Sequence, residues 1–155
     1  MWLAACAGGA AFWLATFAIS LTPVAAQYRA GLSISYYPML AEAVVGGLVL
    51  GVAVSYVLYR HFDRIPTRTP MAKSILVSLF ALVAVTVLVD VPGKFFTATE
   101  NPVRYFVIGA AFNIVRFLAL SVGVGALYGW NSSRGAPPTH RDERQSPRAR
   151  PRRRG

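Results

Sequence analysis

Ionisable side chains inside long apolar runs are the residues of this sequence that could do chemistry. Arg116 lies about 16 Å into one such run at 1.5 Å per residue. Asn113 precedes it by three residues and therefore shares its helical face. Two other runs each hold one acid near an end, Glu42 and Asp90. Because a long arginine side chain can reach toward an interface, we expect one polar cluster of Glu42, Asp90, Asn113 and Arg116.

Two interpretations of this cluster compete. In the first, Arg116 pairs with one carboxylate and fixes the register of the helices, while the other acid sits at the wet end of its helix. In the second, the cluster lines a polar cavity that binds an anionic substrate or a lipid headgroup, or that relays protons. The residue types support either interpretation, because a buried guanidinium must satisfy five donors in both.

The residues needed for other kinds of chemistry are sparse. Cys6 is the single cysteine, which excludes an intrachain disulfide and a thiolate metal site. The two histidines, His61 and His140, both fall in polar segments. A membrane enzyme needs a nucleophile or an acid–base set, which the apolar runs do not offer. We therefore predict no enzymatic activity, no metal and no cofactor.

The elements that must position the cluster are four apolar runs. The chain has 155 residues, of which 55% are hydrophobic and only 14% charged. About 20 apolar residues cross a bilayer as a helix, since the backbone must satisfy its own hydrogen bonds there. Four runs have this length: 2–26, 39–59, 74–91 and 105–130. They predict an all-α integral membrane protein, a four-transmembrane-helix bundle over residues 1–130, with prolines at or between the span ends.

Lysine and arginine predict the orientation of these spans. Twelve of them fall in the connection between the second and third runs and in the C-terminal tail. The opposite side has three: Arg29, Lys94 and Arg104. Because positive charge accumulates on the cytoplasmic side, we expect both termini to be cytoplasmic, in the cell (plasma) membrane.

The first run allows a second interpretation. Val24-Ala25-Ala26 has the small side chains of a signal-peptidase site, so residues 1–26 are either a retained helix or a cleaved signal peptide. No basic residue precedes the run, which is also longer than the apolar region of a signal peptide. These features favour retention.

Small residues indicate how the helices approach one another. In the second run they recur every four residues and form a smooth ridge that allows close backbone contact. Gly123 extends the same pattern to the fourth run. The predicted helix-packing residues are Ala43, Gly47, Gly51, Ser55 and Gly123. Packing within one four-helix bundle and an interface with a partner or a second copy are both open.

The C-terminal segment 131–155 is polar and basic. Its eight arginines against two acids give it a net charge of +6, and it lacks the apolar residues for a core. We expect a disordered tail that lies against anionic lipid. Nucleic acid is a poor partner, because no aromatic residue follows Trp130 for base stacking. The predicted headgroup contacts are Arg60, Arg64, Arg68, Lys73, Arg152, Arg153 and Arg154.

The sequence therefore favours a multi-pass membrane protein that works as a non-enzymatic accessory, assembly or scaffold subunit. Small-residue ridges, few polar groups and a charged tail are typical of such modules. The alternative is a small oligomeric transporter or channel that uses the polar cluster around Arg116. The expected partners are the lipid bilayer, its anionic headgroups, and either another membrane protein or a second copy.

Overall fold

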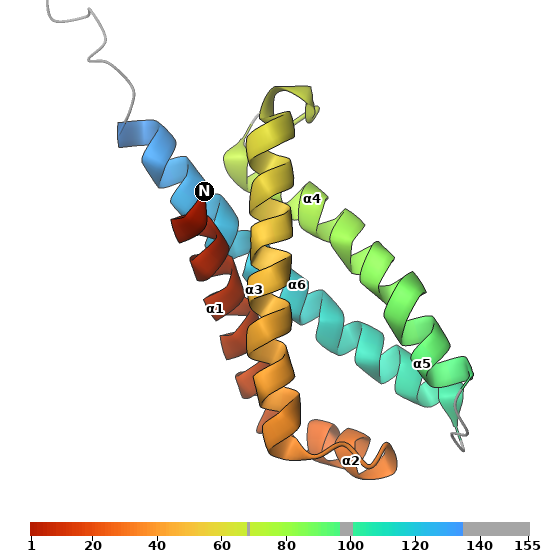
Figure 1. The fold of residues 1–155 in the computed structure, drawn as a ribbon. Coiled ribbons are helices and arrows are strands. Elements are labelled where there is room, and N and C mark those ends of the chain that lie inside the picture. The colour runs from red at the N-terminus through yellow and green to blue at the C-terminus, as the bar shows by residue number, and fades with distance from the viewer. Residues whose placement is uncertain (68, 97–100, 135–155) are drawn as a thin grey trace, which may run out of the picture.

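The computed structural model describes residues 1–67, 69–96 and 101–134, with the side chains of these residues up to Trp130. Every regular element in these ranges is helical (Figure 1). The elements are α1 Trp2–Ser20, α2 Pro23–Gly31, α3 Tyr36–His61, the 3-10 turn η1 Phe62–Arg64, α4 Pro70–Val85, the π-helical turn η2 Thr86–Asp90, α5 Val91–Phe95 and α6 Pro102–Arg134. Four helical stretches are long and apolar enough to cross a membrane: Trp2–Ser20, Tyr36–Arg64, Pro70–Phe95 and Pro102–Trp130. The predicted all-helical architecture with four such helices is confirmed.

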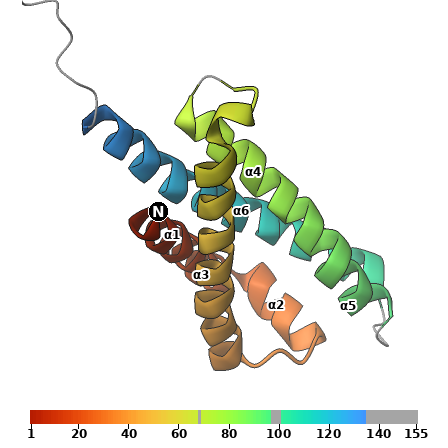
Figure 2. The same ribbon diagram turned by 45° about the horizontal axis from the view of Figure 1, so that its top comes forward.

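The four long helices lie in the spatial order α3, α1, α6, α4 (Figures 1 and 2). α1 contacts both α3 and α6, whereas α4 packs mainly along α6. The buried share of the apolar stretch is accordingly 39% for α1 and 11% for the stretch that contains α4. The first helix is therefore central, and α4 lies at an edge.

The two described ends of the chain lie at the same end of the bundle. The start of α1, the connection between α3 and α4, and the last turns of α6 gather there (Figure 1). The helix α2, the start of α3, and α5 lie at the opposite end. This is the arrangement that four antiparallel spans in succession produce.

The first helix ends earlier than predicted, at Ser20 and not near residue 26. Thr22 begins a separate helix, because its Oγ1 accepts a hydrogen bond from Ala25 N at 3.2 Å. Pro23 occupies the first helical position, where its missing N–H leaves nothing unsatisfied. The predicted cleavage motif thus lies within α2, with Ala25 buried.

The other helices are longer than predicted. α3 begins at Tyr36, with Pro38 in its first turn, where a proline is tolerated. The third span continues to Phe95 through the π-helical turn η2, which directly precedes the helical Pro92 region. α6 continues to Arg134, so the first four residues assigned to the tail are helical. The rest of the predicted disordered tail lies outside the described residues.

Close backbone contacts hold α1 between its two neighbours. A side-chain carbon added at Gly51 of α3 would overlap the carbonyl oxygen of Ala5 in α1. One added at Gly123 of α6 would lie 2.7 Å from the carbonyl oxygen of Ala7. Gly47 meets the carbonyl oxygen of Gly9 in the same way, at 3.0 Å. The described packing of these glycines is therefore within the chain, against α1.

Of the remaining predicted packing residues, Ser55 is buried on α3 and Ala43 is only half-buried. Larger side chains fill the space beside the glycines. Phe12 of α1 meets Phe117 of α6 edge to face, with ring centroids 5.8 Å apart. The aliphatic core around this pair consists of Ala4, Val54, Leu58, Leu120 and Val124.

Candidate functional site

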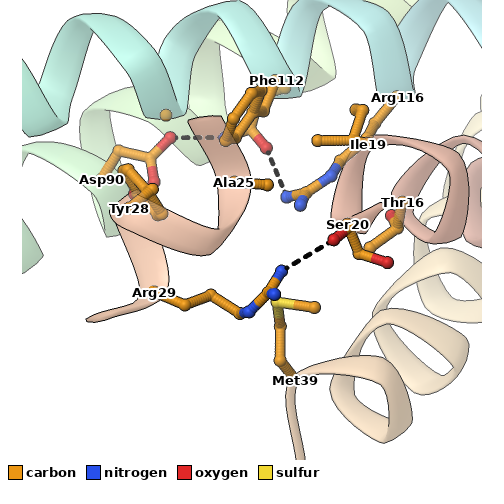
Figure 3. A pocket seen from close by; sticks show the side chains of 12 residues that line it. Thr16, Ile19, Ser20, Ala25, Tyr28, Arg29, Met39, Asp90, Phe112 and Arg116 are labelled. Carbon is orange, nitrogen blue, oxygen red and sulfur yellow. Dashed lines mark hydrogen bonds between the residues drawn. The ribbon is translucent and has the colours of Figure 1, made fainter. Parts of the chain in front are cut away.

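A chain of hydrogen bonds connects three of the four residues predicted to form a polar cluster. The Asn113 amide donates through Nδ2 to Oδ2 of Asp90 at 2.6 Å. Oδ1 of the same amide accepts a hydrogen bond from Nη1 of Arg116 at 3.1 Å (Figure 3). The neutral amide therefore stands between the acid and the base, and it uses both of its functional groups.

Local helix geometry explains how these three residues meet. Asn113 and Arg116 are three residues apart on α6, so their side chains lie on one face. Asp90 is the last residue of the π-helical turn η2. Such a turn contains more residues than an α-helical turn, so it changes the direction in which all later side chains point. π-helical turns are frequent at functional sites.

The three residues line a small pocket with a volume of about 60 Å³. The pocket is bounded by α1, α2, α3, η2 and α6, at the end of the bundle where α2 lies. Its lining residues are Thr16, Ile19, Ser20, Ala25, Tyr28, Arg29, Met39, Asp90, Gly109, Phe112, Asn113 and Arg116. This volume accommodates a few water molecules or one small polar group, and no large substrate.

Arg29 is a second arginine in this pocket, and the sequence analysis did not predict it. It lies in the last turn of α2 and donates to the backbone oxygen of Ser20 at 3.1 Å. Its guanidinium also stands over the ring of Tyr36, 5.0 Å from the centroid. The available signal was Thr22-Pro23, a cap followed by a first-turn proline, which starts a new helix and carries Arg29 back toward the bundle.

Arg116 is only partly satisfied by its neighbours. Its Nε is buried and has no hydrogen-bond partner among the described residues. Its acceptor, Oδ1 of Asn113, is uncharged. The described residues that line the pocket thus supply two guanidinium groups and one carboxylate, and this carboxylate accepts a hydrogen bond from the Asn113 amide.

Glu42 is the member of the predicted cluster that the structure leaves out. It is exposed on α3 and does not line the pocket. The structure therefore brings together Asp90, Asn113 and Arg116, adds Arg29, and places Glu42 elsewhere.

The residues predicted to contact lipid headgroups fall into three groups. Arg60 and Arg64 are exposed at the end of α3 and in η1. Lys73 is buried, since its ammonium donates to the Phe62 carbonyl and lies 3.8 Å from the centroid of the Phe62 ring. Lys73 was predicted to contact lipid headgroups, but its ammonium group lies inside the protein. Arg68, Arg152, Arg153 and Arg154 lie outside the described residues.

The described residues contain no group of histidine, cysteine and acidic side chains that could hold a metal ion. Cys6 is a free, exposed thiol on α1. Comparisons of this chain with protein-family models, curated proteins and solved structures find no match.

Proposed function

We propose that this chain is an integral protein of the cell membrane, with both termini on the cytoplasmic side. Four helices of sufficient length and apolarity support insertion. Large apolar side chains are exposed all along them, for example Leu79, Phe80 and Leu88 in the third span. The excess of lysine and arginine around the α3–α4 connection and in residues 131–155 supports the orientation.

Retention of residues 1–26 is part of this proposal. α1 lies between α3 and α6, and its backbone contacts Gly51 on one side and Gly123 on the other. Removing it would uncover both glycine faces at once and leave Ser20 and Thr16 missing from the pocket wall. These contacts support a permanent helix.

Within the membrane, the chain is proposed to act as a non-enzymatic accessory, assembly or scaffold subunit that binds a transmembrane helix of another protein. The observation that carries this proposal is an apolar groove of about 230 Å³ between α4 and α6. It is lined by Ile75, Ser78, Leu79, Leu82, Ile114, Phe117, Leu118 and Ser121. The buried hydroxyl of Ser78 has no partner among the described residues. A helix with a small polar side chain could fill the groove and bond this hydroxyl, as transmembrane helices often do.

The test is the composition of the complex. The tagged chain is extracted from native membranes in mild detergent, and the mass and subunits of the complex are measured. We expect a foreign membrane protein at fixed stoichiometry, and we expect Leu79→Trp in the groove to release it. The control is Val45→Trp, which introduces the same side chain at an exposed position of α3. A monomer bound only to lipid, or a pure homo-oligomer, would contradict the proposal.

A small oligomeric transporter or channel is the second candidate, and the polar pocket is the observation that favours it. Hydrogen bonds connect Asp90 of η2 to Asn113 and Arg116 of α6, and ionisable residues within membrane spans often mark the path of a substrate or ion. The variant Arg116→Leu distinguishes a transport function of this pocket from a purely structural role. Loss of a solute flux at an unchanged amount of protein supports transport, whereas a lower amount of folded protein supports a structural role.

A further inference from the structure

Two positive charges face one pocket without a carboxylate between them. Figure 3 shows the guanidinium of Arg29 entering from α2 and that of Arg116 entering from α6. The acceptors of both are uncharged: the Ser20 carbonyl for Arg29 and the Asn113 amide oxygen for Arg116. Among the described residues, Asp90 is the one acid that lines the pocket, and it accepts its hydrogen bond from Nδ2 of Asn113 and not from either arginine. The described lining residues therefore have an excess of one positive charge.

Asp90 can balance one of these two charges, and the other has no counter-charge among the described residues that line the pocket. A charge without a counter-ion is less favourable in a partly desolvated site than in water, because the effective dielectric constant is lower. The Nε donor of Arg116 is buried and unpaired, so a hydrogen-bond acceptor is also missing. A third cation stands near the pocket wall, since Lys94 Nζ lies 5.0 Å from the centroid of the Tyr28 ring. One bound anion would balance the excess positive charge and accept a hydrogen bond from the unpaired Nε of Arg116.

We propose that this pocket binds one phosphate-type oxyanion between Arg29 and Arg116. A guanidinium is planar and presents parallel donors that match phosphate oxygens, so two of them can hold one tetrahedral group. The volume of about 60 Å³ leaves room for such a group between the two arginines. The source of the group is either a lipid headgroup or free phosphate, because both present the same oxygens. The proposal goes beyond the proposed function and does not depend on the α4–α6 groove.

The test measures the thermal stability of the full chain in detergent against three added probes. They are inorganic phosphate, dihexanoyl phosphatidic acid, and dihexanoylglycerol, which has the same acyl chains without phosphate. A ligand that binds only the folded state raises Tm with concentration. A rise with phosphatidic acid alone identifies a lipid headgroup, and a rise with both phosphate compounds identifies a site open to free phosphate. No rise with either phosphate compound, or an equal rise with dihexanoylglycerol, overturns the proposal.

Variants connect the response to the pocket. We expect Arg29→Gln and Arg116→Gln each to raise the apparent Kd for the responding probe at least about tenfold, since each removes a charged hydrogen bond. Arg104→Gln is the matched control, because Arg104 lies near the same end of the bundle but is exposed and outside the pocket. If Arg116→Gln does not fold, Arg29→Gln answers the question alone. An unchanged Kd in Arg29→Gln, or an equal loss in Arg104→Gln, contradicts the site.

Discussion

The two halves of α1 have opposite surroundings. The half from Ala4 to Ala11 contacts its neighbours through backbone and small side chains, with Gly51 on one side and Gly123 on the other. The half from Thr16 to Ser20 lines the polar pocket with Arg29 and Arg116. We call residues Ala4 to Ala11 the sealed half of α1, because close contacts cover it, and residues Thr16 to Ser20 the open half, because they line the pocket. Close backbone approach thus occurs where glycines face α1, and the pocket lies further along the same helix, where larger and charged side chains line it.

The same division separates the interactions that hold the fold from those that offer a site. In the sealed half, contact between backbones leaves no room for a side chain, so stability depends on shape. In the open half, hydrogen bonds connect Asp90, Asn113 and Arg116 around a space that solvent can enter. A change in the sealed half should therefore reduce the free energy of unfolding more than a change in the open half.

The largest effect is expected from a side chain added in the sealed half. Gly51→Val should reduce the free energy of unfolding by about 3 kcal/mol or more, because its carbons would overlap the Ala5 carbonyl oxygen and α3 would have to move. Gly46→Val is the control, since nothing lies within 4 Å of the position of its added carbon. Unfolding in detergent by increasing SDS measures both. Equal stability of the two variants would show that α1 and α3 do not meet as described.

A smaller loss is expected when the polar chain of the open half is broken. Asn113→Leu should reduce the free energy of unfolding by about 1–2 kcal/mol, because Asp90 and Arg116 then lack their shared partner. Glu42→Leu, which removes an acid that is exposed and outside the pocket, should leave stability unchanged. The same SDS titration compares them. A loss in Glu42→Leu as large as in Asn113→Leu would place Glu42 back in the cluster.

The smallest effect separates two serines one turn apart on α4. Ser74 donates to the Ser121 carbonyl of α6 at 2.9 Å, so Ser74→Ala should reduce the free energy of unfolding by about 0.6 kcal/mol. Ser78→Ala should cause no loss, because the buried hydroxyl of Ser78 has no partner among the described residues. The difference between the two variants is the measured quantity. If it is absent, hydroxyl bonds contribute nothing measurable next to the backbone contacts of the sealed half.

The four long helices could be predicted because apolar length alone specifies them. The break after Ser20 could not be placed by the same criterion, since the apolar run continues through Val24-Ala25-Ala26 and a first-turn proline resembles a proline at a span end. The error mattered for the site. With one straight helix over 2–26, Arg29 falls in a connecting loop and not in the wall of a pocket.

The position of Glu42 shows that the depth of a residue in a membrane does not specify the direction in which its side chain points around the helix axis. The prediction grouped it with Arg116 because both lie in the same half of the bundle. At about 100° per residue, Glu42 is about 140° around α3 from Gly47 and about 180° from Gly51. Because those two glycines face α1, Glu42 must point away from the bundle. The ridge of small residues on α3 indicated which face of that helix packs against its neighbour. Comparing the angular position of Glu42 with this ridge would have excluded Glu42 from the polar cluster.

The central place of α1 also has a consequence for biosynthesis. α1 is synthesised well before α6, one of its two neighbours, because more than a hundred residues separate Ala7 from Gly123. At about 5–20 residues per second, the face of α1 that meets Gly123 waits on the order of ten seconds for its partner. During that time α1 and α3 can already pair, whereas α4 has little to hold it until α6 arrives. Until α6 is made, the face of α1 that packs against Gly123 therefore lacks the helix that covers it in the folded chain.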